Sequence, residues 1–115
     1  MFTEIYKHLK NNGFDVYSIG QHKGICSSPY LVIKENGTNE IIGTSLSNEM
    51  VEIILYYPLG AYSELNQYKQ SALYCMKLLK GVRRIIEGSP TIIDDDKKAY
   101  TTSFYYQKIR MKEGV

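Results

Sequence analysis

The chain has 115 residues, 43% of them hydrophobic, and a formal net charge of +2. This length predicts one domain, residues 1–115, with a single core and no separate catalytic domain. Acids and bases are mixed along the chain, which argues against a dedicated nucleic-acid binder, because such a protein needs a basic patch to displace counterions. No apolar run has the length needed to cross a bilayer, so we expect no membrane partner.

The two cysteines, Cys26 and Cys75, stand far apart and form no metal-binding spacing. Together with an N-terminus that lacks a signal-peptide profile, they predict a soluble protein in a reducing cytosol. Cys75 falls inside a predicted helix, where we expect a small buried hydrophobe.

Tyrosine is the unusual component of the composition: there are eleven Tyr, three Phe and no Trp. A Tyr side chain combines a large apolar ring with a polar tip, so it suits interfaces and half-buried sheet surfaces. The strand preference of Tyr explains the same enrichment without any interface. The composition therefore leaves both interpretations open.

The first predicted element is a helix over Phe2–Asn12, because apolar residues recur there at helical spacing, and Gly13 is expected to end it in a left-handed conformation. The alternating residues Phe14–Tyr17 predict a short strand. Residues 18–28 hold two glycines and three serines and predict a mobile loop.

Tyr30–Ile33 predicts a strand that is apolar on both faces and therefore central in its sheet. Glu35–Asn39 contains Asn-Gly, which predicts a tight turn. Ile41–Thr44 is either a weak strand or an extended link. Ser47–Tyr57 is the longest predicted strand, with both faces largely apolar, and Pro58 ends it.

A second amphipathic helix is predicted over Ser63–Lys80, with Ser63 as its N-cap and Gly81 after its end. Its apolar stripe consists of Leu65, Tyr68, Ala72, Met76 and Leu79.

Val82–Glu87 predicts a short strand or an irregular turn. Thr91–Ile93 predicts a strand, residues 94–98 a hairpin turn, and Ala99–Lys112 a final strand. On that strand the face with Tyr100, Thr102, Phe104 and Tyr106 is expected to be the more buried. Strands and helices do not alternate, so the predicted fold class is α+β, with a mainly antiparallel sheet flanked by two helices.

The acidic run Asp94-Asp95-Asp96 is a candidate for cation binding, because hard cations prefer clustered oxygens. Adjacent strand residues point to opposite faces, however, and EF-hand spacing is absent. The turn preference of Asp favours a solvated turn instead, and Lys97 and Lys98 neutralise part of the charge.

Nucleophilic catalysis would need a pair such as Cys26 and His22, but no motif spacing supports one, and His8 lies on a helix face beside lysines. Gly20–Gly24 lacks the Gly-Lys-Ser/Thr ending of a phosphate loop and is interpreted as a loop that orders on a partner. We therefore expect no enzyme activity, no catalytic residues, no metal and no cofactor.

Arg83 and Arg84, with Lys77 and Lys80, form a small basic patch that suits an acidic partner or passing DNA. Favourable placement of cations at a helix end explains them without any partner. The full set of predicted interface residues is Gln21, His22, Lys23, Asp94, Asp95, Asp96, Lys97, Arg83 and Arg84.

The chain resembles the phage minor tail protein family that includes tail terminators and tail-to-head joining proteins. The resemblance covers most of the chain and rests on element order and residue class. It is carried by the N-terminal helix with Phe14–Tyr17, by Pro29–Ile33, by the strand Met50–Tyr57 leading into the helix Ser63–Lys80, and by the closing hairpin with Thr91–Ile93 and Tyr100–Tyr106.

The resemblance implies an α+β fold and a ring, usually of six subunits, at the head-proximal end of a phage tail. Such a ring ends tail-tube polymerisation and provides the surface to which the filled head docks. The implied partners are further copies of the chain, the major tail protein and head connector proteins, and DNA is met only as it passes through the lumen. The implied location is the host cytoplasm during assembly and then the virion tail at the head-tail junction.

Two other classes of function remain open from the sequence. One is a small protein-binding module of a mobile element that recognises a protein strand through an exposed sheet edge. The other is a small enzyme that uses Cys26 or the Asp run.

Overall fold

The structure is a computed structural model that describes residues 2–22, 24–40, 46–60, 62–85 and 89–111. Two helices and a six-stranded, mostly antiparallel sheet make up these residues, which confirms the predicted α+β class. In chain order the elements are α1 (Phe2–Asn11), β1 (Val16–Ser18), β2 (Tyr30–Glu40), β3 (Leu46–Pro58), α2 (Tyr62–Lys77), β4 (Arg83–Ile85), β5 (Ile92–Asp94) and β6 (Ala99–Met111).

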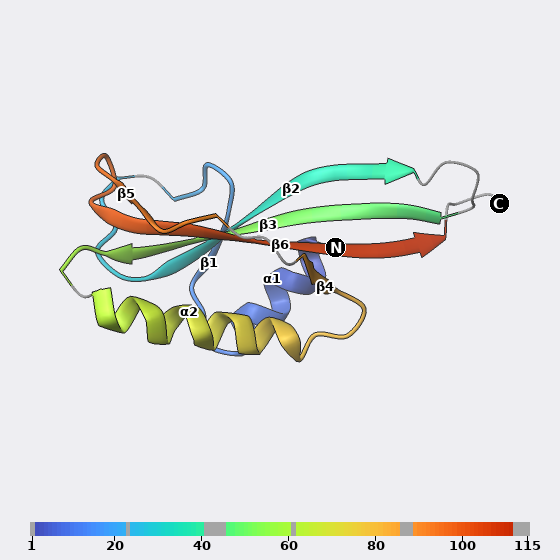
Figure 1. Cartoon of the computed structure of the whole chain (residues 1–115), viewed down its shortest axis with the longest axis horizontal. Coiled ribbons are helices and arrows are strands. Elements are labelled where there is room, and N and C mark those ends of the chain that lie inside the picture. The colour runs from blue at the N-terminus through green and yellow to red at the C-terminus, as the bar shows by residue number, and fades with distance from the viewer. Residues whose placement is uncertain (1, 23, 41–45, 61, 86–88, 112–115) are drawn as a thin grey trace.

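The strands are ordered β1-β2-β3-β6-β4, and β5 also pairs with β6. Only the pairing of the short strand β1 with β2 is parallel among the described strands. Both helices lie on one side of the sheet, and the long strands β2, β3 and β6 continue past them toward one end of the molecule (Figure 1). The longest extent of the molecule, 51 Å, is about twice the other two.

The main core lies between the helices and the sheet. Of the two largely apolar faces predicted for β3, the face with Val51, Ile53 and Leu55 is buried in this core. The predicted inner face of β6 is confirmed by Phe104 and Tyr106. The buried residues of β3 and of β6 follow the two-residue period of a strand, which places alternate side chains on one face. Each fully buried apolar side chain of this kind contributes about 1.5–3 kcal/mol to folding.

Helix α1 buries Ile5 and Leu9 in this core. It ends at Asn11, one residue before the predicted end, and Gly13 has the predicted left-handed conformation, with a φ of 91° that glycine adopts readily. The amide of Phe14 donates to the Leu9 carbonyl at 3.1 Å, which closes the helix end. The Nε2 atom of His8 donates to the Cys75 carbonyl at 2.6 Å and ties α1 to α2, because a carbonyl can only accept.

Helix α2 buries Leu65, Ala72, Cys75 and Met76, which confirms the expected burial of Cys75. Its predicted bounds were wrong at both ends. The helix begins at Tyr62, so Ser63 lies in the first turn and is not the N-cap. It ends at Lys77, because the amides of Leu78 and Leu79 bond to carbonyls three residues back and tighten the chain.

Among the described residues, neither helix has the length and apolar character that a membrane-crossing helix requires.

The predicted turn at Glu35–Asn39 was also wrong. Strand β2 runs through these residues and pairs with β3 on both sides of them, with a register shift between Glu35 and Thr38. The Asn-Gly pair therefore forms a bulge-like irregularity in the pairing of β2 with β3, where β2 contributes more residues than β3. The weak strand or link predicted at 41–44 lies outside the described residues.

Candidate interaction surfaces

The hairpin turn between β5 and β6 is built by one of its three aspartates. The Asp94 carboxylate accepts the backbone N–H groups of Asp96 and Lys97, each at 3.1 Å. Lys98 follows with a positive φ of 53°. Asp94 is therefore a turn-forming residue, whereas Asp95 and Asp96 are exposed. We call residues 92–98 the acidic hairpin.

No group of three or more His, Cys, Asp or Glu side chains among the described residues is arranged to hold a metal ion.

The loop over residues 18–28 is joined to the acidic hairpin. The backbone N–H of Cys26 donates to the Lys97 carbonyl at 2.7 Å, and the Cys26 thiol donates to the Ser28 carbonyl at 3.2 Å. Cys26 is buried on the sheet face opposite the helices, with Tyr30, Val32 and Ala99. Two segments that the sequence presents as separate contact loops therefore form one surface.

An aromatic stack anchors the same loop to the sheet. The ring of His22 stacks on Tyr30 at 4.0 Å between centroids, and Tyr17 packs edge-on against both rings. Tyr30 stacks in turn on Tyr56, and the Lys97 ammonium lies 5.5 Å from the Tyr56 ring centroid. His22 is thus a packing residue of this surface.

Gln21 and Lys23 are the other two residues of this loop that the sequence predicts at an interface. The Gln21 side chain accepts the Ser18 backbone N–H at 2.8 Å and so stabilises the start of the loop. Lys23 lies outside the described residues.

Burial weakens both thiols as nucleophiles. It raises the pKa of Cys26 above its ordinary value, against the opposing charge of Lys97. It also raises the pKa of Cys75. Because the thiolate is the reactive form, both cysteines behave as packing residues at neutral pH.

The second surface is a cavity of about 460 Å³ between α2 and β4, which we call the basic groove. Lys77 and Arg84 supply its cations, and the exposed ring of Tyr74 stands at its rim. Arg84 and Lys69 lie 5.8 and 5.9 Å from the Phe104 ring centroid. The groove is lined by Gln70, Leu73, Tyr74, Met76, Lys77, Val82, Arg84 and Tyr106.

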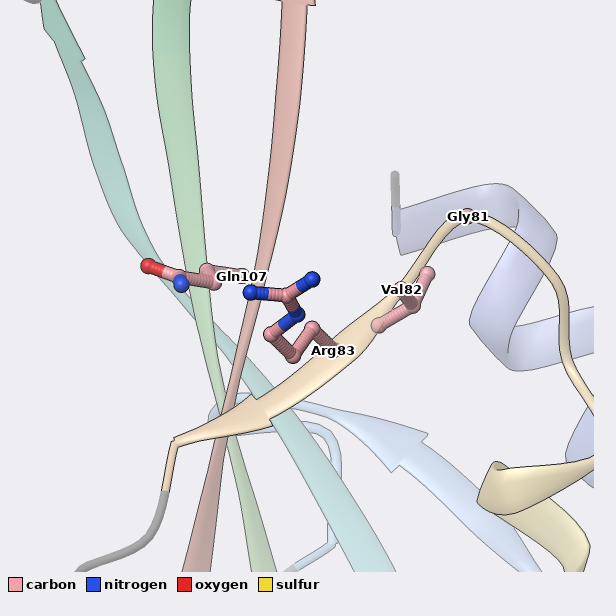
Figure 2. A pocket seen from close by; sticks show the side chains of 4 residues that line it. All are labelled: Gly81, Val82, Arg83 and Gln107. Carbon is pink, nitrogen blue, oxygen red and sulfur yellow. The ribbon is translucent and has the colours of Figure 1, made fainter.

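The two arginines of β4 belong to different cavities, because adjacent strand residues point to opposite faces. Arg84 lies opposite Tyr106 in the ladder and lines the basic groove. Arg83 lies opposite Gln107 and lines a separate cavity of about 350 Å³, together with Gly81 and Val82 (Figure 2). The single basic patch expected from the sequence is therefore divided.

The acidic hairpin and the basic groove lie at different places along β6. Asp94 pairs with Ala99, and Arg84, which lines the basic groove, pairs with Tyr106. These positions on β6 are about 23 Å apart along the strand, and Figure 1 shows β5 and β4 at separate places along β6. The predicted interface residues thus fall into two groups, with the loop and hairpin together and the arginines apart from them.

The edge of β6 between β4 and β5 is occupied by a residue that sequence reasoning missed. The hydroxyl of Ser89 accepts the Ser103 backbone N–H at 2.8 Å, and its carbonyl accepts the Thr102 hydroxyl at 2.9 Å. No sequence signal distinguishes Ser89 from an ordinary loop serine. The burial of Cys26, in contrast, was foreseeable, since cysteine is among the residues most often buried.

A comparison of the chain with protein-family models and with curated proteins found no match.

Proposed function

We propose that this chain is a structural virion protein that caps a phage tail tube, ends tail polymerisation and provides the head-docking surface. It acts as one subunit of a ring, six-membered in the family that the sequence resembles. Its partners are further copies of the chain, the major tail protein and head connector proteins.

The observation that carries this proposal is the pair of unlike surfaces on one rigid strand. A subunit that contacts its neighbours head to tail needs two different complementary patches, and such contacts close into a ring when the rotation allows it. The acidic hairpin and the basic groove differ in charge and are about 23 Å apart along β6.

The arrangement of elements also supports the proposal. The resembled family implies an antiparallel sheet flanked by helices, and this chain has that architecture. The loop over residues 18–28 is held against the acidic hairpin by Cys26 and Lys97. The two segments offer a composite surface for a tube or connector protein.

Electron microscopy of particles made without this protein tests the proposal. We expect tails of irregular length and heads that are not joined to tails, with both defects repaired when the intact gene is supplied in trans. Tails of normal length joined to heads in the absence of the protein would contradict the proposal.

A second candidate is a protein-binding module that accepts a strand at the edge of β2. Strand β1 pairs with only Leu31, Val32 and Ile33 of β2, so among the described strands the rest of that edge faces no neighbour. Exposed edges of this kind accept added strands. A non-phage partner that pairs with β2, with no ring in any assembly, would favour this candidate.

A further inference from the structure

We infer that the basic groove of one copy of this chain binds the acidic hairpin of the next copy. The inference rests on the proposed ring function and names the contact that builds the ring. It identifies the occupant of the groove as a second copy of the chain.

The basic groove has an excess of positive charge. Residues 65–86 contain five cations, namely Lys69, Lys77, Lys80, Arg83 and Arg84, and no acidic residue. Among the described residues, no carboxylate lies within salt-bridge distance of Lys77 or Arg84. An acidic segment that enters the groove would therefore meet cations that no described carboxylate neutralises.

Apolar side chains surround the groove. Tyr74, which lines the groove from α2, is 65% exposed, and Leu78, which follows the end of α2 and lines a neighbouring cavity with Tyr74, is 55% exposed. Apolar surface left in water costs about 25 cal/mol for each Å², so an apolar segment that covers the exposed Tyr74 ring gains stability. The groove therefore suits an occupant that is both acidic and apolar.

The acidic hairpin has that composition. Asp95 and Asp96 are exposed at its tip. Ile92 and Ile93, on its first strand, are 58% and 54% exposed. Because the Asp94 carboxylate is used within the turn, the tip presents the other two carboxylates in a fixed arrangement.

The two surfaces of one copy cannot meet each other. Both are fixed to β6, about 23 Å apart along one strand. Contact is possible only between copies, and it joins unlike surfaces, which is the heterologous geometry that generates rings.

A contact of this size is weak when it is formed once. Stable interfaces bury about 800 Å² on each partner, whereas a hairpin tip in one groove buries less. A ring repeats this contact at each subunit boundary. The overall association is therefore much tighter than one contact, because each further contact forms within an assembly that already holds the subunits together. We therefore expect weak association of the purified chain and tight association in an assembled tail.

A charge-reversal cycle on the purified full-length chain tests the inference. Backbone amide NMR signals are followed during dilution from millimolar protein. In the wild-type chain we expect concentration-dependent shifts in two places, the second half of α2 with β4, and the acidic hairpin. Lys77→Glu alone, or Asp95→Lys with Asp96→Lys, should weaken association by about tenfold because each reversal replaces attraction with repulsion.

The chain that carries both sets of reversals should recover association to within about threefold of the wild type. Lys7→Glu, the same charge change at an exposed position of α1, serves as the matched control and should leave association unchanged. All these sites are exposed, and the spread of the amide spectrum verifies that each variant folds.

The inference is overturned if the amide signals of the wild-type chain do not shift on dilution, or shift at other residues. It is also overturned if the charge reversals do not weaken association, or if the chain that carries both sets of reversals does not regain it. These results leave the ring proposal standing, since that proposal is tested separately by particles made without the protein. High salt should weaken the wild-type association, as expected for a contact between solvent-exposed charges.

Discussion

The backbone N–H of Cys26 donates a 2.7 Å hydrogen bond to the carbonyl oxygen of Lys97. This bond joins the loop over residues 18–28 to the acidic hairpin and places the Cys26 side chain in the small core on the far side of the sheet. The loop and the hairpin are therefore one structural unit, and a substitution in either segment should alter the conformation of the other.

Cys26→Ala should lower the free energy of unfolding by about 1 kcal/mol, because it leaves a small cavity and removes the thiol contact with Ser28. Chemical denaturation measures the change. The neighbouring variant Ser27→Ala, at an exposed position, should stay within about 0.5 kcal/mol of the wild type. Equal effects of the two substitutions would contradict the packing role of Cys26.

Tyr30→Phe should raise the free energy of unfolding by about 1 kcal/mol, because the Tyr30 hydroxyl is buried and has no hydrogen-bond partner among the residues that the structure describes. Tyr57→Phe is the matched comparison, since the Tyr57 hydroxyl donates to Glu64 at 3.1 Å in an exposed position. That variant should lose up to about 0.5 kcal/mol. A destabilised Tyr30→Phe protein would mean that its hydroxyl is satisfied.

Alkaline pH should destabilise the protein through its buried tyrosines. Burial raises the pKa of Tyr106 from 10.0 to about 12, against the opposing charge of Arg84, and burial also raises the pKa of Tyr30 and Tyr68. The unfolded chain releases these protons first. The stability that the groups contribute is thus complete below pH 10.0 and is lost as pH rises through about 12.

Denaturation at a series of pH values measures this loss, which is at most about 1.4 kcal/mol per pH unit for each group. Tyr106→Phe should flatten the profile between pH 10.0 and about 12. Tyr74→Phe, at an exposed ring, should not. An unchanged profile in Tyr106→Phe would show that this tyrosine does not control the alkaline loss.

Asp94→Ala should cost about 1 kcal/mol of stability, because its carboxylate accepts two backbone N–H groups in the turn. Asp95→Ala should leave stability within about 0.5 kcal/mol of the wild type and should instead weaken association between copies. Thermal or chemical unfolding of both variants separates the two roles. Similar stability losses would show that the turn depends on both aspartates.

The sheet and the two helices were predictable because their side chains follow the periods of strands and helices. Val51, Ile53 and Leu55 alternate on one face of β3, and Ile5 and Leu9 share one face of α1. These local patterns agree with the tertiary packing, but alternation alone did not show which of the two apolar faces of β3 the helices cover.

The errors arose where pairing between distant segments overrides a local preference. The long ladder between β2 and β3 continues across Asn36-Gly37, although that pair favours a turn. The hydrogen bond from Cys26 to Lys97 joins two segments that lie far apart in the sequence, and no local pattern indicates it. The division of Arg83 from Arg84 follows from strand alternation, but only once residues 83–85 are known to form a strand.

We propose that this chain forms a ring at the head-proximal end of a phage tail. Electron microscopy of purified particles, labelled with an antibody against this protein, tests it most directly. The account predicts label confined to the junction between head and tail. Label along the tail tube, label at the distal tip, or particles without label would contradict it.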